Sequence, residues 1–509
     1  MSPQAQSSPQ AAGPARVLVL GGGGREHALV WSLAREAAVE AVIAAPGSDA
    51  IGAESKVRCV PGVSATDPAA VLALATSEEV DLVVVGPEAP LAAGVVDVLE
   101  EAGVPTFGPI RAAARIEWSK AFCREVAAAA GVRIARGEAF WSLEPALALA
   151  KDLATAPGSC GVVVKADGLM AGKGVTVCDD YAGAEGALRA LFADGPAAAG
   201  GAAGEGAAGE GAAGEGAAGE ARAVGRPPVV VVEERLVGAE ASLIALCDDH
   251  GALSLPPARD HKRLLDDDKG PNTGGMGAYS PVPDLPESLC ATLVDMIHLP
   301  ILAELTRRGA PFRGALYAGL MLTPEGPVLI ECNARFGDPE IQALLPRLAV
   351  PLGPLLLGAA LGDLAGAAAS LGLHGRMLPT TGDAAVAVVL AAADYPASPR
   401  RGDPISGLDE AAQAGATVFH AGTVRGDDGR YRTNGGRVLS VVGLGSTIGA
   451  ARASAERAAD LVSWQGMQRR HDIAARLPAA AGERAAVSHP PIETAGWDKA
   501  GSQKGGGAA

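Results

Sequence analysis

Hydrophobic positions near the N-terminus form short continuous runs that alternate with amphipathic stretches. The first run, Arg16–Leu20, precedes an expected helix from Glu26 to about Glu36. Such runs are typical of strands buried on both faces, and their alternation with helices indicates parallel pairing. The same alternation continues with expected strands at 41–45 and 82–85 and expected helices at 68–77 and about 91–102. The pattern predicts a doubly wound parallel sheet, a Rossmann-like domain over 16–117.

From about Lys120 the pattern changes to helices interleaved with strands and hairpins. Two short strands at 161–165 and 174–178 enclose a glycine-rich loop, and further strands are expected at 229–232, 316–321 and 328–330, before a helix near Pro339. After a stretch broken by Pro and Gly near 375–383, another α+β segment follows. We therefore expect a multidomain α/β and α+β chain, with a mixed domain over 118–350 and a small C-terminal domain over 380–478.

Three segments have low complexity. Residues 1–15 and 480–509 are rich in small and turn-forming residues and are expected to be disordered tails. An Ala-Ala-Gly-Glu-Gly repeat runs from 200 to about 221. Its period of five fits neither a helix nor a strand, so we expect a flexible insertion at about 196–226.

Composition narrows the functional classes. Among 509 residues, 42 Lys+Arg against 58 Asp+Glu give a net charge of −16, which argues against binding to nucleic acid. No apolar run approaches the ~20 residues of a membrane span. The start MSPQAQSSPQ lacks the features of a signal peptide. Seven scattered cysteines without a CxxC motif favour reduced thiols, so we expect a cytoplasmic protein.

The first glycine-rich loop lies between an expected strand and an expected helix. It contains Gly21, Gly22, Gly23 and Gly24, where free backbone N–H groups and a helix N-terminus favour an anion. The dinucleotide pattern G-x-G-x-x-G fails here, and no acidic residue stands at the end of the second expected strand. The loop therefore indicates either a phosphate-bearing substrate or only a tight turn.

The second glycine-rich loop lies between two expected strands and carries lysines at both ends. Its candidate ligand-binding residues are Lys165, Asp167, Gly168, Gly172, Lys173 and Gly174. The spacing is not that of a Walker A motif. Backbone N–H groups and ammonium charges in such a hairpin can fold over a polyphosphate. The alternative is a solvated hairpin that happens to carry lysines.

The third feature is a charged cluster at the end of the last strand expected before 340. Side chains alternate along a strand, so Glu331 and Asn333 share one face while Cys332 points away into the core. A carboxylate and an amide oxygen are ligands that suit Mg²⁺. Arg335 follows on the same face and can bind phosphate or carboxylate. The alternative is a surface strand end with a salt bridge.

Two other stretches are rich in polar and turn-forming residues. They are Asp260–Arg263 and Pro271–Pro281, and alone they indicate only irregular loops. The acidic triplet Asp266–Asp268 between them is expected to be a solvated turn.

These motifs together resemble the phosphoribosylamine–glycine ligase family, also called glycinamide ribonucleotide synthetases, which are ATP-grasp enzymes of purine synthesis. The resemblance covers roughly 16–475 apart from the repeat. The matching stretches are GGGGREHAL at 21–29, VGPEAPL at 85–91, SKAF at 119–122, VKADGLMAGKGV at 164–175, DHKR at 260–263, GPNTGGMGAYSP at 270–281, RFGDPE at 335–340, HAGT at 420–423 and TNGGRVL at 433–439.

The resemblance implies an ADP-forming ligase that joins glycine to 5-phosphoribosylamine through glycyl phosphate, with ATP and Mg²⁺ or Mn²⁺. Such chemistry requires no protein nucleophile, because positioning and charge neutralisation carry it. It also implies small-molecule substrates, no nucleic acid, no membrane, and a possible transient contact with the preceding enzyme of the pathway.

Carried over by position, the resemblance assigns roles to particular residues. ATP would be bound by Lys120, Lys165, the loop of 167–174, Glu233, Leu236 and Glu240, and the metal by Glu331 and Asn333. Glycine and the acyl phosphate would be surrounded by Asp260, Lys262, Arg263, Asn272, Thr273, Gly274, Gly275, Arg335 and Asp338. The loop of Gly22, Gly23 and Gly24 would face the phosphoribosylamine phosphate.

The chain departs from the family at several positions. The family usually has Asn at 22, Ala at 170, Phe at 332, Cys at 334 and Gly at 474; the residues here are Gly22, Met170, Cys332, Ala334 and Ala474. The second acid that many ATP-grasp enzymes place before the Glu-x-Asn pair is also missing from 316–319. Two alternatives stay open: a carboxylase that uses bicarbonate on an aminoimidazole ribonucleotide, and a non-catalytic nucleotide-binding protein.

Overall fold

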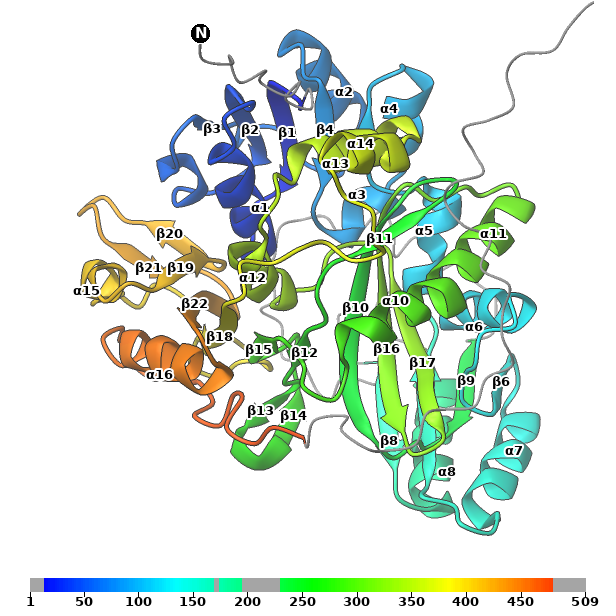
Figure 1. Cartoon of the computed structure of the whole chain (residues 1–509). Helices are drawn as coiled ribbons and strands as arrows, with labels where there is room; N and C mark the ends of the chain where they lie inside the picture. The colour runs from blue at the N-terminus through cyan, green and yellow to red at the C-terminus, as the bar shows by residue number, and fades with distance from the viewer. Residues whose placement is uncertain (1–12, 169–173, 195–228, 479–509) are drawn as a thin grey trace, which may run out of the picture.

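The structure, a computed structural model, describes residues 13–168, 174–194 and 229–478. Its N-terminal part is a five-stranded parallel sheet with the order β3-β2-β1-β4-β5 (Figure 1). The strands are β1 (Arg16–Gly21), β2 (Ala41–Pro46), β3 (Val57–Cys59), β4 (Leu82–Val85) and β5 (Thr106–Phe107). The connecting helices are α1 (Gly24–Ala34), α2 (Pro68–Ser77), α3 (Glu88–Ala92) and α4 (Val95–Glu101). This confirms the predicted doubly wound sheet.

The prediction of one continuous helix over about 91–102 is wrong, because the structure has two helices there. The stretch expected as a helix over about 91–102 is divided into α3 and α4 by Gly94, which has a φ of 77°. A left-handed residue cannot continue a right-handed helix, and Gly adopts that conformation without the steric cost of a Cβ atom. The short strands β3 and β5 were not predicted.

The middle of the chain forms two antiparallel sheets. One sheet has the order β6-β9-β7-β8 and is packed against two helices that cover its apolar side. Its elements are β6 (Gly137–Phe140), α7 (Leu143–Thr155), β7 (Val162–Ala166), β8 (Val175–Cys178), α8 (Tyr181–Asp194) and β9 (Val230–Glu234). The other sheet has the order β11-β10-β16-β17, from β10 (Ala239–Cys247), β11 (Ala252–Ser254), β16 (Gly314–Thr323) and β17 (Gly326–Asn333).

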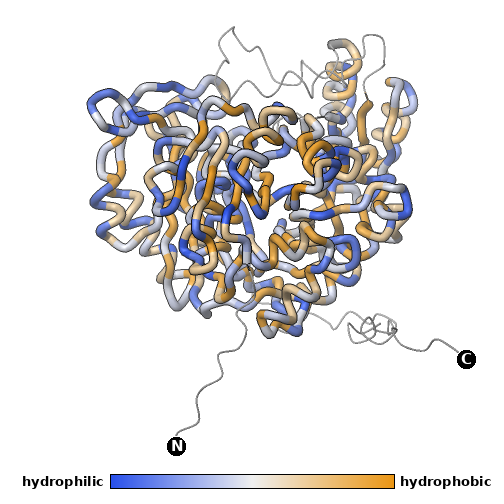
Figure 2. Tube along the Cα trace, turned by 90° about the horizontal axis from the view of Figure 1, so that it is seen from above, coloured by the Kyte–Doolittle hydropathy of each residue, from blue (hydrophilic) through white to orange (hydrophobic). Residues whose placement is uncertain are grey.

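Helices beside the second sheet link it to the N-terminal part. They are α5 (Arg111–Trp118), α6 (Lys120–Ala129), α10 (Glu287–Leu293) and α11 (Leu299–Arg307), with a π-helical turn at Val294–His298 joining the last two. The resulting continuous helix Glu287–Arg307 is long and apolar enough to cross a membrane by length and composition, but half of its most apolar window is buried in the molecule. This burial is typical of a core helix. Figure 2 shows hydrophobic and hydrophilic stretches alternating along the chain, with several hydrophilic turns at the edge of the molecule.

The last sheet draws strands from both sides of the expected boundary near 380. Its order is β12-β15-β18-β22-β19, from β12 (Arg259–Asp260), β15 (Gly277–Ser280), β18 (Ala384–Ala391), β19 (Thr417–His420) and β22 (Arg437–Gly445). Helix α16 (Ile448–Ala459) packs on β18 and β22. The remaining elements are α12 (Glu340–Leu344), α13 (Gly353–Leu361), α14 (Leu364–Ser370), α15 (Leu408–Gln413) and the hairpin β20 (Thr423–Arg425)–β21 (Tyr431–Thr433). The C-terminal segment is thereby attached directly to the polar stretch of 259–281.

The acidic triplet joins the hairpin of β13 (Arg263–Leu265) and β14 (Lys269–Asn272) as a short 3₁₀ turn, Asp266–Asp268. It is a turn, as expected, but it is not merely solvated. Arg470, whose side chain is 1% exposed, places Nη1 2.7 Å from Oδ1 of Asp268. The backbone N–H of His471 donates to Asp266, and that of Asp267 donates to Asp472. The triplet therefore attaches the hairpin to the C-terminal segment (Figure 1).

Candidate active site

Lys165 connects the two central sheets. It projects from β7, and its Nζ lies 2.6 Å from Oε2 of Glu233 on β9 and 3.0 Å from the backbone oxygen of Ile330 on β17. Arg124 donates from Nη1 to the other carboxylate oxygen of Glu233 at 2.6 Å. A buried carboxylate between two cations is well compensated, so this network fixes the distance between the sheets. Leu236 follows two residues after β9.

The start of α6 holds the second glycine-rich loop. Ser119 caps α6 and donates from Oγ to Oδ2 of Asp167 at 3.0 Å, and the N–H of Ala121 donates to Oδ1 at 3.1 Å. Lys120 donates from Nζ to the backbone oxygen of Gly168 at 3.1 Å, and burial lowers the pKa of this ammonium. Gly174 accepts from the N–H of Ala166 at 2.8 Å. The predicted residues Gly172 and Lys173, with Met170, lie outside the described residues, as does the 200–221 repeat.

Glu331 and Asn333 stand two residues apart on β17, so they share a face as predicted. The Glu331 side chain is 46% exposed, and the Nζ of Lys262 lies 3.3 Å from its Oε1. The Lys262 ammonium lowers the pKa of Glu331, which keeps the carboxylate ionised. Lys262 also lies 3.0 Å from Oε2 of Glu240. The ammonium therefore bridges the carboxylates of Glu331 and Glu240.

The donor set of this pair fits a hard divalent cation. Glu331 supplies carboxylate oxygens, and among the described residues the Asn333 amide oxygen accepts a long 3.4 Å contact from Arg335. Within the described part of the chain, no group of three or more His, Cys, Asp or Glu residues could hold a metal. Two protein oxygens suit Mg²⁺ or Mn²⁺ that takes its remaining ligands from phosphates and water.

Arg335 is held from two sides by carboxylates. Its Nη2 lies 3.1 Å from Oε1 of Glu117, and its Nε lies 3.6 Å from Oε2 of Glu88. Burial acts to lower the pKa of Arg335, but these carboxylates outweigh it and keep the pKa above its usual range. The buried Nε makes no hydrogen bond to the described residues. The guanidinium is thus held in one orientation between the two carboxylates.

Asp338 is tied to the C-terminal sheet. Arg437, on β22, places Nη2 2.8 Å from Oδ2 of Asp338 and donates from Nη1 to the backbone oxygens of Asp338 and Gly274, each at 2.6 Å. Gln342 donates to Oδ1 at 2.7 Å. Burial raises the pKa of Asp338, but Arg437 and the neighbouring arginines lower it overall. One guanidinium therefore holds the predicted segments of 272–275 and 335–340 together.

The polar stretch of 260–275 is ordered by local hydrogen bonds. Thr273 donates from Oγ1 to the backbone oxygen of Lys262 at 2.9 Å and accepts from the N–H of Gly275 at 3.0 Å. Burial raises the pKa of Asp260 to about 7. Arg263, opposite Asn272 in the β13–β14 hairpin, donates to the backbone oxygen of Gly270. Its guanidinium thus stabilises the hairpin, whereas Lys262 reaches the strand of Glu331.

The first glycine-rich loop lies beside the helix that follows Asp338. A Cβ atom at Gly22 would stand 2.4 Å from the backbone oxygen of Gly47, and one at Gly24 would stand 3.0 Å from Nε2 of Gln342. The N–H of Gly23 donates to Glu26 at 2.7 Å. A side chain at position 22, where the family usually has Asn, would therefore require the Gly47 backbone to shift. Gln342, the neighbour of Gly24, donates to Asp338, so the loop lies in the same region as the 335–340 segment.

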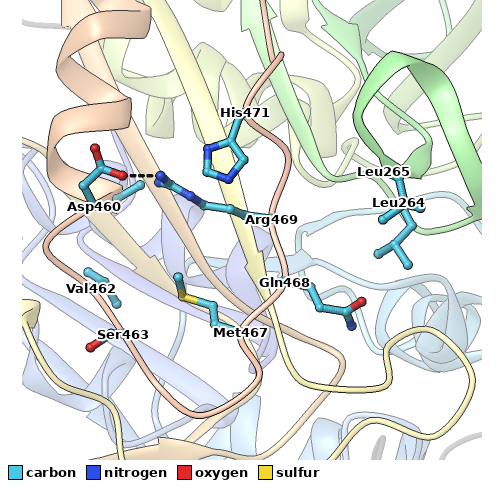
Figure 3. A pocket seen from close by; sticks show the side chains of 10 residues that line it. Leu264, Leu265, Asp460, Val462, Ser463, Met467, Gln468, Arg469 and His471 are labelled. Carbon is cyan, nitrogen blue, oxygen red and sulfur yellow. Dashed lines mark hydrogen bonds and ion pairs between the residues drawn. The ribbon is translucent and has the colours of Figure 1, made fainter.

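A hollow of about 470 Å³ lies elsewhere, between the β13–β14 hairpin and the segment after α16 (Figure 3). Leu264 and Leu265 line it on one side, and Met467, Gln468 and Arg469 on another. Arg469 forms an ion pair with Asp460 at its edge. None of the predicted site residues lines this hollow.

Comparison with known proteins decides the family. The phosphoribosylglycinamide synthetase models match in three parts: the N domain at residues 15–117, the ATP-grasp (A) domain at 118–207 and 215–341, and the C domain at 385–476. The chain belongs to the phosphoribosylglycinamide synthetase family. It is 44% identical over 463 residues to a phosphoribosylamine–glycine ligase of Leifsonia xyli and 45% identical over 468 residues to that of Streptomyces coelicolor, in each case covering 91% of this chain and all of the relative.

Solved structures agree with this family membership. The crystal structure of a phosphoribosylamine–glycine ligase from Thermotoga maritima matches with a TM-score of 0.68 and 29% identity, covering 90% of this chain and all of that one. A biotin carboxylase domain from Hydrogenobacter thermophilus matches with a TM-score of 0.61 at 14% identity, covering 90% of this chain and 92% of that one. The second likeness shows a common fold only.

The structure also reveals residues near the site that sequence reasoning missed. Glu117 and Glu88 contact Arg335, Arg25 donates to the backbone of Phe336, and Arg437 binds Asp338. Glu88 and Arg437 belong to motifs that matched the family, VGPEAPL and TNGGRVL, but their partners are far away along the chain. Glu117 lies two residues before the SKAF motif, so no signal in the sequence marked it.

Proposed function

We propose that this member of the phosphoribosylglycinamide synthetase family is the ATP-dependent ligase that joins glycine to 5-phosphoribosylamine. The products are glycinamide ribonucleotide, ADP and phosphate, in the second step of de novo purine (IMP) biosynthesis. The observation that supports this most is the single site formed by Lys165, Glu331 and Arg335, contributed by two sheets. In it, the lysine would bind phosphate, the Glu331 carboxylate would bind the metal, and the guanidinium would bind the glycine carboxylate.

The residues act by binding and neutralising charge. Lys120 and Lys165 would bind the ATP phosphates, with Asp167, Gly168, Gly172, Lys173 and Gly174 forming the loop over them. Glu233 and Leu236 would flank adenine, and Glu240 would reach the ribose. The ion pair of Glu240 with Lys262 must rearrange for that contact. Fixed cations beside the phosphates stabilise charge that develops during phosphoryl transfer.

Glu331 and Asn333 would hold Mg²⁺ or Mn²⁺. When bound, such an ion neutralises phosphate charge and orients the terminal phosphate. Lys262 contacts Glu331, so its ammonium would lie close enough to stabilise the negative charge of the phosphate during its transfer.

Glycine and the acyl phosphate would be bound by Arg335, Asp338, Lys262 and Arg263, together with Asp260, Asn272, Thr273, Gly274 and Gly275. A glycine carboxylate oxygen would attack the γ-phosphorus, with ADP leaving. The amine of phosphoribosylamine would then attack the carbonyl carbon, releasing phosphate and one proton. The loop of Gly22, Gly23 and Gly24 would bind the sugar phosphate through its backbone. We also propose that the protein is cytoplasmic and that it transiently contacts the preceding enzyme of the pathway.

Product analysis tests the proposal. Purified protein is incubated with ATP, Mg²⁺, glycine labelled with ¹⁸O in its carboxylate, and freshly generated phosphoribosylamine. We expect glycinamide ribonucleotide, ADP and one ¹⁸O atom transferred into each phosphate. AMP with pyrophosphate would contradict the acyl phosphate route, and turnover driven by bicarbonate with an aminoimidazole ribonucleotide would favour the carboxylase instead.

A further inference from the structure

Glu117 contacts two consecutive residues at the end of the strand that carries Glu331 and Asn333. Its Oε2 accepts from the N–H of Ala334 at 2.8 Å, and its Oε1 lies 3.1 Å from Nη2 of Arg335. The Glu117 side chain is only 6% exposed. A carboxylate that accepts both a backbone N–H and a guanidinium is restricted to one orientation, and it restricts its partners in turn.

The same chain segment also binds the second glycine-rich loop. Glu117 is the penultimate residue of α5, and the backbone oxygen of Trp118 accepts from the N–H of Gly168 at 2.8 Å. Ser119 and Ala121 hold Asp167, as described above. Five consecutive residues therefore contact the loop at one end and the strand terminus of Asn333 at the other.

Arg335 depends on these contacts for its orientation. Besides Glu117, its guanidinium has the longer 3.6 Å ion pair with Glu88 and the 3.4 Å contact with Asn333. It also donates from Nη1 to the neighbouring backbone oxygen of Phe336 at 3.1 Å. Glu117 makes the shortest carboxylate contact, so its loss would free the guanidinium to turn toward Glu88.

We propose that Glu117 is a positioning residue of the ligase, which holds Arg335 in the orientation that receives the glycine carboxylate. This inference rests on the proposed function. Glu117 itself does not reach the reacting atoms; it acts through Arg335 and through the backbone that follows Asn333. Because the contact is short and shielded from solvent, an isosteric change that removes only the charge should weaken glycine binding specifically.

The test compares wild-type protein with Glu117→Gln by steady-state kinetics. Gln can still accept from the N–H of Ala334 but loses the attraction for Arg335. We expect the KM for glycine to rise roughly tenfold, the loss typical of a charge-assisted contact, with the KM for ATP changed less than about twofold. Glu125→Gln is the matched control, since Glu125 pairs with Arg308 on the outer side of α6 and is 64% exposed.

A double-mutant cycle with Arg335→Met, which removes the charge that Glu117 binds, separates positioning from a structural role. If Glu117 acts through Arg335, adding Glu117→Gln to Arg335→Met changes the glycine KM by less than about twofold. If the glycine KM of the double variant rises by the product of the two single-variant increases, the inference is overturned. An unchanged glycine KM, or equal losses for glycine and ATP, in Glu117→Gln would overturn it too. Wild-type protein without glycine-dependent ADP formation would instead contradict the proposed function.

Discussion

The Nζ of Lys262 lies 3.3 Å from Oε1 of Glu331, although 69 residues separate the two along the chain. This ion pair joins the strand of the proposed metal ligands to the polar stretch proposed to surround glycine. It also favours the charged form of Glu331, because an adjacent ammonium stabilises a carboxylate. We therefore expect a change in charge at the metal ligands to affect glycine binding as well.

The first prediction concerns Glu331→Ala. Loss of the carboxylate should reduce turnover at least about 100-fold, because a charge-stabilising group is removed from the site. The fold should persist, since the side chain is 46% exposed. Glu325→Ala, on the exposed turn between β16 and β17, is the control. Activity near wild type in a folded Glu331→Ala protein, judged by thermal unfolding, would refute the assignment of Glu331 to the metal.

The second prediction concerns Gly319, which lies opposite Glu331 on the neighbouring strand β16. A Cβ atom there would stand 2.7 Å from Cγ of Glu331, so Gly319→Ala must displace the carboxylate. We expect roughly a 10- to 100-fold loss of turnover from a displacement on the order of 1 Å. Gly186→Ala in α8 is the control, because a Cβ atom there meets no neighbour within 4 Å. Equal activity of the two variants would argue against a close contact.

The third prediction concerns acid stability. His298 is fully buried, and burial lowers its pKa from 6.5 to about 4. Between these pH values the unfolded chain binds more protons at this residue than the folded chain does. The contribution of His298 to stability is therefore complete above about pH 6.5 and is lost as the pH falls toward about 4. Between pH 7.5 and pH 5, the free energy of unfolding should therefore fall by about 2 kcal/mol less in His298→Leu than in the wild type. Urea unfolding at both pH values measures this, with the exposed His250→Gln as control; equal pH sensitivity in His298→Leu would contradict it.

The fourth prediction concerns Arg470, which connects the C-terminal segment to the β13–β14 hairpin. Arg470→Met leaves Asp472 and Asp268 without their buried partner and should destabilise the protein by about 2 kcal/mol. Arg476→Met is the control, because Arg476 is 85% exposed and its pair with Asp267 is a surface pair. Thermal unfolding measures both variants. Equal melting temperatures of the two variants would show that the pairs of the buried Arg470 contribute no more than the surface pair of Arg476.

The sequence predicted the elements whose signals are local. Continuous apolar runs indicated β1, β2 and β4, and alternation placed Glu331 and Asn333 on one face. The division of the helix at Gly94 was missed, because glycine inside a helical pattern does not reveal its φ. Ala474, where the family usually has glycine, adopts a φ of 56° that the sequence likewise did not indicate.

Contacts between distant segments could not be predicted. Arg437 binds Asp338 from 99 residues away, and Glu117 binds Ala334 from 217 residues away. No spacing rule relates such positions, since the partners meet only after the sheets have packed. The strand order that joins β12 and β15 to β18 depends on the same tertiary packing.

The central claim is an ADP-forming ligation of glycine to phosphoribosylamine, and an omission assay tests it most directly. ADP release is measured with purified protein and ATP while glycine, phosphoribosylamine or the divalent metal is left out in turn. We predict rapid ADP release only when all three are present. ADP release that persists without glycine, or none in the complete mixture, would contradict the claim.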